Sequence, residues 1–150
     1  PALCYWTDSE DEGIKYFSGI ARYEKNFIHD INSGPEEGYK MFLDLGDLSH
    51  VAEIWLNGHS LGIVWAKPYR VDITGIIKPG PNKLVVEVAN TWSNRLVGDA
   101  ITGSRFTSTN IKVTDIDGAL DVRLPWAKVP LIKSGLFGPV TITSVIPVRF

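Results

Sequence analysis

The sequence predicts an all-β fold, a β-sandwich of the jelly-roll type. Apolar and polar residues alternate along short runs such as 21–27 and 39–45, which is typical of strands that bury one face. Turns rich in glycine, proline and asparagine separate these runs, and no helical periodicity of useful length is visible. Short strands punctuated by turns favour a sandwich, and about eight of them would form a jelly roll.

The clearest predicted element is a hairpin around Asn57-Gly58. Residues 51–56 and 61–65 are rich in strand-forming side chains, and the Asn-Gly dipeptide between them readily supplies the two positive φ angles of a tight turn. Pro68 ends the second strand because proline has no backbone donor for a sheet. A further extended segment follows over residues 69–74.

Other strands are predicted on both sides of this hairpin. In the first predicted strand, residues 14–28, the side chains of Ala21, Tyr23 and Phe27 face the same side. In the later strand 84–89, Val85 interrupts the polar face, and we expect that polar face to be partly covered. Residues 73–77 are expected to make one helical turn and residues 5–13 an exposed acidic lead-in. The long stretch 91–133 is expected to be irregular, and such long loops are usually functional. The remaining strands are predicted at residues 39–45, 84–89 and 137–148.

Length and charge bound the class of protein. The 150 residues suffice for one domain, residues 1–150, with a sizeable core. The net charge is −2 with scattered lysines and arginines, which argues against nucleic acid as a partner. A membrane partner is not expected either, because no apolar run approaches the roughly 20 residues of a spanning helix. The first residues contain no signal-peptide pattern, and we expect the chain to be a segment excised from a larger protein.

Catalytic and metal-binding patterns are weak. The three histidines do not pair at helical spacing, Cys4 is the single cysteine, and no G-x-S-x-G motif is present. Asp115-Ile116-Asp117-Gly118 resembles only part of a calcium loop, so a polar turn is expected there. Carboxylates are plentiful, but nothing in the sequence brings two of them to one cleft. We therefore predict no catalytic residue, no metal ligand and no cofactor; a structural calcium ion is left open.

Aromatic residues at predicted loop ends form the strongest candidate site. An indole stacks on the apolar face of a sugar ring, and covering roughly 100 Å² in this way is worth about 2.5 kcal/mol. A useful site therefore needs several aromatic rings and polar anchors. The alternative is that tryptophans such as Trp55 and Trp92 pack in the core or against a neighbouring domain. The carbohydrate-binding candidates are Trp65, Tyr69, Trp92, Asn94, Arg95, Asp99 and Trp126.

Several motifs together resemble a known family. The L-x-L-G strand end at Leu43–Gly46, the L-N-G hairpin at Leu56–Gly58 and the P-G-x-N-x-L-x-V-x-V-x-N string at Pro79–Asn90 resemble the jelly-roll, galactose-binding-like domain of glycoside hydrolase family 2. The strings TWSNRLVGD at 91–99 and SGLFGPV at 134–140 are similar to the C-terminal β-sandwich of the α-L-rhamnosidase-like enzymes of family 106.

This resemblance implies a non-catalytic accessory domain, sugar-binding or structural, of a multidomain glycoside hydrolase that degrades plant or other complex polysaccharide. The implied partner is a catalytic domain of the same polypeptide, with an oligosaccharide as a second expected ligand. The segment itself is not expected to hydrolyse O-glycosyl bonds, although the parent is. The implied location is periplasmic or extracellular. The alternatives are an autonomous carbohydrate-binding module and a purely structural spacer domain.

Overall fold

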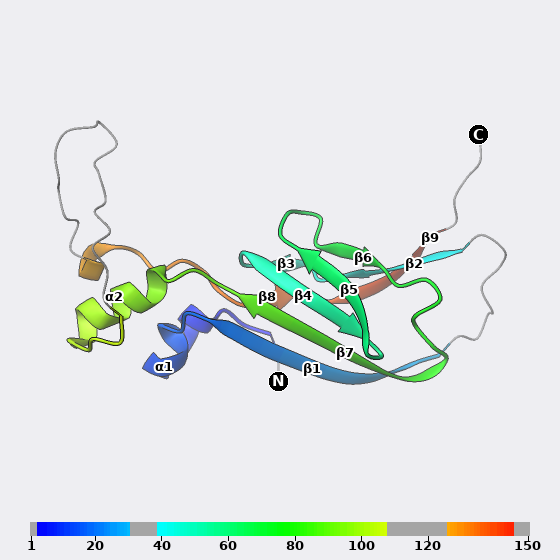
Figure 1. Cartoon of the computed structure of the whole chain (residues 1–150), viewed down its shortest axis with the longest axis horizontal. Coiled ribbons are helices and arrows are strands. Elements are labelled where there is room, and N and C mark those ends of the chain that lie inside the picture. The colour runs from blue at the N-terminus through cyan, green and yellow to red at the C-terminus, as the bar shows by residue number, and fades with distance from the viewer. Residues whose placement is uncertain (1–2, 31–38, 108–125, 146–150) are drawn as a thin grey trace, which may run out of the picture. The chain divides into compact units, whose positions relative to one another are not determined.

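The computed structural model describes residues 3–30, 39–107 and 126–145. The chain divides into two compact units. The first, which we call the sandwich unit, comprises Pro1–Tyr5, Ile20–Asn90 and Ser134–Phe150, and the second, the helical unit, comprises Trp6–Gly19 and Thr91–Lys133. All the described strands belong to the sandwich unit and all the described helices to the helical unit (Figure 1).

A four-stranded antiparallel sheet forms one layer of the sandwich unit. Its strand order is β1 (Ile20–His29), β7 (Gly80–Ala89), β4 (Val51–Leu56) and β5 (His59–Val64). The predicted hairpin between β4 and β5 is confirmed, with φ of 54° at Asn57 and 83° at Gly58. One face of this sheet is apolar and buried, and it consists of Ala52, Ile54, Leu56, Leu84, Val86 and Val88.

A three-stranded sheet forms the second layer, behind the first in Figure 1. It is built from β6 (Arg70–Asp72), β2 (Lys40–Asp44) and β9 (Thr141–Val145), while β3 (Asp47–Leu48) and β8 (Leu136–Gly138) make a separate short pair. The predicted turn at 73–77 is confirmed, because the amides of Ile76 and Ile77 both donate to the carbonyl of Ile73. The apolar side chains that this layer and its connections bury include Leu43, Leu45, Leu48, Ile73 and Leu136. The predicted β-sandwich is therefore confirmed.

Two predicted strand boundaries are wrong. The first strand starts at Ile20 rather than at residue 14, because residues 12–15 form the short helix α1 (Glu12–Lys15), whose first turn is capped by the Asp11 carboxylate 2.7 Å from the amide of Gly13. The last predicted strand is split into β8 and β9, since Gly138 has a φ of 69° and Pro139 lacks a backbone donor. The acidic residues of the lead-in are exposed as expected, but Trp6, in the 3-10 turn η1 (Trp6–Asp8), is buried.

The absence of helices was also a wrong prediction. Helix α2 (Ser93–Thr102) lies in the stretch that was expected to be irregular, and it ends at Gly103 with a left-handed φ of 74°. Its buried face includes the polar or small residues Asn94, Gly98 and Asp99 beside Leu96 and Val97. A search for apolar periodicity does not register such a face, so the helix was missed.

Two predicted turns lie outside the described residues, at 32–38 and at 115–118. Within the described part of the chain, no helix is long and apolar enough to cross a membrane.

Candidate functional site

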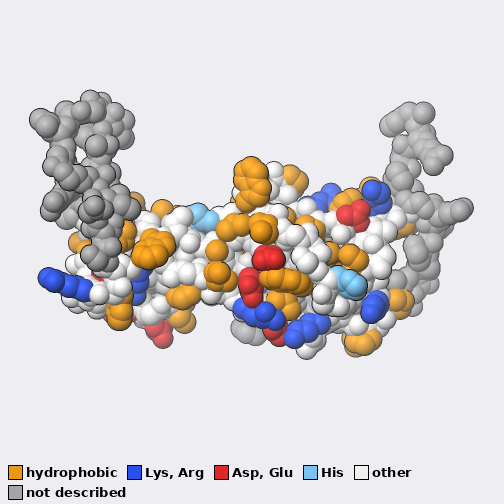
Figure 2. Space-filling model, in the orientation of Figure 1, with side chains coloured by type: hydrophobic (Ala, Val, Ile, Leu, Met, Phe, Trp, Pro, Cys, Tyr) orange, Lys and Arg blue, Asp and Glu red, His pale blue; other side chains and the backbone are white. Residues whose placement is uncertain are grey.

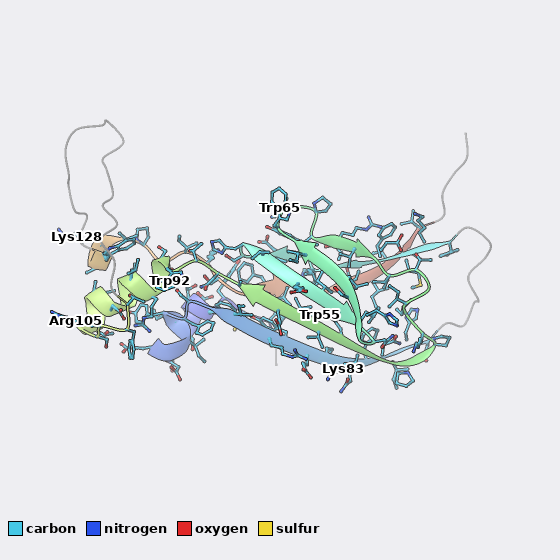
Figure 3. The ribbon with its side chains drawn as sticks, in the orientation of Figure 1. Trp55, Trp65, Lys83, Trp92, Arg105 and Lys128 are labelled. Atoms are coloured by element: carbon cyan, nitrogen blue, oxygen red, sulfur yellow. The ribbon has the colours of Figure 1, made fainter. Side chains whose placement is uncertain are left out.

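Trp65 and Tyr69 belong to the sandwich unit, and the structure gives them opposite environments. Trp65 follows the end of β5, points away from the strands in Figure 3, and is 75% exposed. Tyr69 is only 9% exposed, and its carbonyl accepts a hydrogen bond from the amide of Leu45 at 2.9 Å. Trp65 therefore offers an accessible ring, whereas Tyr69 packs in the core.

The other five predicted residues lie in the helical unit, on or beside α2. Trp92 caps the start of the helix without a side-chain hydrogen bond and is 66% exposed (Figure 3). Trp126 starts the 3-10 turn η2 (Trp126–Lys128), which packs on α2, and is half-buried. The structure thus gathers five of the seven candidates in one unit and leaves the other two in the sandwich unit.

The side chain of Asn94 binds the backbone of Ile132. Its side chain is 2% exposed; the Nδ2 atom donates to the carbonyl of Ile132 at 2.7 Å, and the Oδ1 atom accepts from the amide of Ile132 at 2.8 Å. A buried side-chain amide whose donor and acceptor are both paired stabilises the fold. Its role here is to hold residue 132 against α2.

Asp99 and Arg95 form a second internal arrangement. Arg95 Nε and Asp99 Oδ1 lie 2.9 Å apart on successive turns, as an ion pair that is not aligned for a hydrogen bond. The other carboxylate oxygen accepts from both the amide and the hydroxyl of Thr107, each at 2.8 Å. Burial raises the pKa of Asp99, but the hydrogen bonds from Thr107 and the charge of Arg95 outweigh it, so the pKa lies below its ordinary value.

The polar groups expected to anchor a sugar are therefore largely engaged within the helical unit. The guanidinium of Arg95 also lies 4.9 Å from the ring centre of Phe106. Among the described residues, no group of three or more histidine, cysteine, aspartate or glutamate side chains could hold a metal ion. The sugar-contacting roles of all seven candidates stay a prediction.

A cavity of about 590 Å³ lies in the sandwich unit, between side chains of both sheets. Its lining is mainly apolar, with Phe27, Leu43, Val86 and Ile142 among the contributors. Such a lining gives a sugar few hydrogen-bond partners, so this cavity does not suit a carbohydrate.

A smaller hollow of about 240 Å³ was missed by sequence reasoning. It lies on the outer face of the four-stranded sheet, and no residue of it was among the predicted candidates. Its residues come from three strands and a turn, and only the cross-strand register brings them together, which no local pattern reveals. The lining consists of Arg22, Trp55, Gly58, Lys83 and Val85.

Comparison with known proteins agrees with the fold. A protein described as "Putative beta-glucuronidase" from Formosa agariphila is 37% identical over 155 aligned residues, which cover 94% of this chain but 13% of that protein. The structure of a rhamnosidase from Novosphingobium sp. PP1Y matches with a TM-score of 0.71 and 39% identity, over 93% of this chain and 12% of the rhamnosidase. A beta-glucuronidase from an uncultured Clostridium sp. matches 60% of this chain and 15% of its own, with a TM-score of 0.50 and 26% identity.

The first two of these matches cover nearly all of this chain. The chain, however, spans only about an eighth of the length of either relative. The resemblance to rhamnosidases that the sequence suggested is confirmed by the structural match. The family model of the galactose-binding-like domain of glycosyl hydrolase 2 matches residues 7–118. The chain belongs to this family, the glycosyl hydrolase 2 galactose-binding domain-like proteins.

Proposed function

We propose that this chain acts as the non-catalytic accessory domain of a larger glycoside hydrolase. The observation that carries the proposal is that the chain corresponds to a small part of much larger proteins. Nearly the whole chain matches the rhamnosidase and the protein described as "Putative beta-glucuronidase", yet the match covers only 12–13% of each of those proteins. A galactose-binding-like sandwich that forms a small part of such proteins leaves the chemistry to the remainder of the polypeptide.

The lining of the larger cavity supports this role. Glycoside hydrolysis normally needs two carboxyl groups that flank the scissile bond, one of them protonated as the acid. Glu24 is the one carboxylate among the described residues that line the 590 Å³ cavity. Hydrogen bonds from Lys83 and Arg22 lower the pKa of Glu24, so it is ionised at neutral pH and cannot donate a proton.

The proposed partner is a catalytic domain in the same polypeptide. The substrate of the whole protein would be a plant or other complex polysaccharide, and its site of action would be periplasmic or extracellular. No cofactor enters the proposed role, because the chain's task is to dock and to help hold a glycan. The partner domain is supported by the small share of each relative that this chain covers. The substrate class and the location extend the family resemblance.

A second candidate function is an autonomous carbohydrate-binding module. The exposed rings of Trp65 and Trp92 favour it, because accessible indoles on a soluble domain suit stacking on sugar rings. The spacer alternative requires Trp55 and Trp92 to be covered. In the chain alone Trp55 is half-buried and Trp92 is exposed, so a spacer role needs a partner domain over Trp92.

Deleting residues 1–150 from the full-length polypeptide that contains them tests the accessory role. We expect the deletion to lower the melting temperature of the remaining enzyme while the folded fraction keeps hydrolysing a small aryl glycoside. Complete loss of kcat in a remaining enzyme that is still folded would contradict the proposal. Circular dichroism establishes the folded fraction before kcat is compared.

A further inference from the structure

The hollow on the outer face of the four-stranded sheet has the composition of a small carbohydrate site. Figure 2 shows hydrophobic side chains on this face with acidic and basic side chains beside them. The volume of about 240 Å³ lies below the roughly 300–1,000 Å³ of ordinary ligand pockets. The hollow therefore suits one small ring rather than a chain of several.

Cross-strand register builds an apolar floor. Trp55 on β4 lies directly opposite Val85 on β7, and Val85 lies directly opposite Glu24 on β1. Val85 is only 7% exposed although its neighbours Leu84 and Val86 point to the core on the other side of the sheet. At the hairpin end, a Cβ added to Gly58 would meet no atom within 4 Å, so this end of the hollow is open.

Ion pairs hold the charged side chains around the hollow in place; we call these side chains the polar rim. The two oxygens of Glu24 contact Arg22 Nε at 2.7 Å and Lys83 Nζ at 2.9 Å, and Arg22 Nη1 contacts Glu87 at 3.0 Å. The hydrogen bonds that Arg22 donates to Glu24 and Glu87 raise the pKa of Arg22, and the hydrogen bonds that Glu24 accepts from Lys83 and then Arg22 lower the pKa of Glu24. The network joins two basic and two acidic side chains, so their formal charges cancel.

The balance of charges selects the type of ligand. Arg22 and Lys83 retain N–H donors beyond those used in the ion pairs, and both carboxylates retain acceptor positions. A hydroxyl group can donate to one kind of group and accept from the other. Because Glu24 and Glu87 offset the charges of Arg22 and Lys83, a carboxylate ligand gains no net attraction there, and it can only accept hydrogen bonds. A neutral sugar ring fits this rim better than an acidic one.

We propose that this hollow binds one neutral pyranose ring of a glycan, with the ring stacked on Trp55 and its hydroxyls bound by Arg22 and Lys83. The inference rests on the proposed accessory role and gives that role a contact surface separate from Trp65 and from α2. In this proposal Trp55 binds a sugar ring in addition to packing on the sheet.

Titration of the ¹⁵N-labelled 150-residue chain with methyl α-L-rhamnoside and methyl β-D-galactoside tests the site. Because one aromatic stack corresponds to a Kd of roughly 10–100 mM, the titration extends to about 500 mM sugar. We expect saturable shifts of the amides of Gly58, Lys83 and Val85, and weaker binding of methyl β-D-glucuronide by about fivefold or more.

Variants then assign the contacts. Trp55→Ala should abolish the shifts, and Lys83→Met should weaken binding by about tenfold, because a charged hydrogen bond is lost. Lys83 is exposed, so this variant keeps the proposal testable if Trp55→Ala unfolds. The matched control is Lys78→Met, which removes an exposed lysine outside the hollow and should leave binding unchanged.

Shifts confined to Trp65 or α2, equal binding by Lys83→Met, or no shift at about 500 mM would overturn the inference. These outcomes would leave the proposed accessory role intact, provided that the chain does not hydrolyse glycosides. Turnover by the chain would instead contradict the proposed function, whatever the titration shows.

Discussion

The side chain of Asn57 donates a hydrogen bond to the side chain of Asn82, with Nδ2 and Oδ1 2.8 Å apart. This contact joins the β4–β5 hairpin turn to the start of β7. Asn57 also donates to the carbonyl of Ile76 and accepts from the amide of Lys83, each at 3.0 Å. The Asn-Gly turn therefore anchors the neighbouring loop as well as reversing the chain.

Replacing Asn82 with alanine should destabilise the sandwich unit strongly. Asn82 is buried, accepts from the amide of Lys78 and donates to the carbonyls of Lys78 and Gly80 in addition to its contact with Asn57. Loss of these bonds leaves buried groups unpaired, and we expect a cost of about 3 kcal/mol in urea unfolding. Asn26→Ala, at an exposed position of β1, is the control and should cost less than about 0.5 kcal/mol. Equal costs would show that the network is unimportant.

Gly46 is predicted to tolerate no side chain. A Cβ there would lie 2.4 Å from the carbonyl carbon of Gly138 and 2.6 Å from the carbonyl oxygen of Pro139, and its φ is 68°. Gly58 has a similar φ of 83° but open space around it. Gly58→Ala should therefore cost about 1–2 kcal/mol from the backbone conformation alone. Gly46→Ala should cost at least about 2 kcal/mol more by thermal melting; similar melting temperatures would argue against the close approach of the two backbones.

Gly98 on α2 allows Tyr16 to pack against the helix. An added Cβ would lie 2.5 Å from both Cβ and Cγ of Tyr16, which is itself buried. Glycine to alanine in an unhindered helix gains about 1 kcal/mol, but overpacking costs about 1–3 kcal/mol, so Gly98→Ala should be destabilising. The control, Ala100→Gly at an exposed position of the same helix, should cost about 1 kcal/mol. A rise in stability for Gly98→Ala would contradict the packing.

Asp99 should make the helical unit sensitive to acid. Its pKa in the folded chain lies below its value in the unfolded chain, because the Thr107 hydrogen bonds and Arg95 outweigh the effect of burial. The stabilisation is therefore complete above the unfolded pKa of about 3.9 and is lost as the pH falls through the folded pKa. Asp99→Asn should cost about 1–2 kcal/mol at pH 7 and flatten the fall of melting temperature below about pH 4. Asp8→Asn, which changes an exposed carboxylate, should leave that fall intact.

Much of the sandwich could be predicted because its signals are local. The Asn57-Gly58 turn has one strongly preferred geometry. In β1 the alternation predicts that Ala21, Tyr23 and Phe27 are less exposed than their neighbours, and in β2 it predicts that Leu43 is buried. The expected cover over Val85 was also correct. These features depend on neighbours in the sequence, which is why periodicity and turn chemistry find them.

The helical unit and the sites depend on distant contacts. Helix α2 buries Asn94 and Asp99, whose partners lie at Ile132 and Thr107, so its inner face does not look apolar. The hollow around Trp55 depends on the pairing of β1, β7 and β4. Tyr69 was a candidate because it lies at a predicted loop end, yet it is buried. Only three-dimensional register supplies this information.

Hydrolysis of aryl glycosides by the purified 150-residue chain separates an accessory domain from an enzyme. The substrates are 4-nitrophenyl α-L-rhamnoside, β-D-glucuronide and β-D-galactoside, with released 4-nitrophenol as the readout and a heat-denatured sample as the blank. A non-catalytic domain releases no more 4-nitrophenol than the blank. Turnover that co-purifies with the folded chain and follows its concentration would contradict the accessory role.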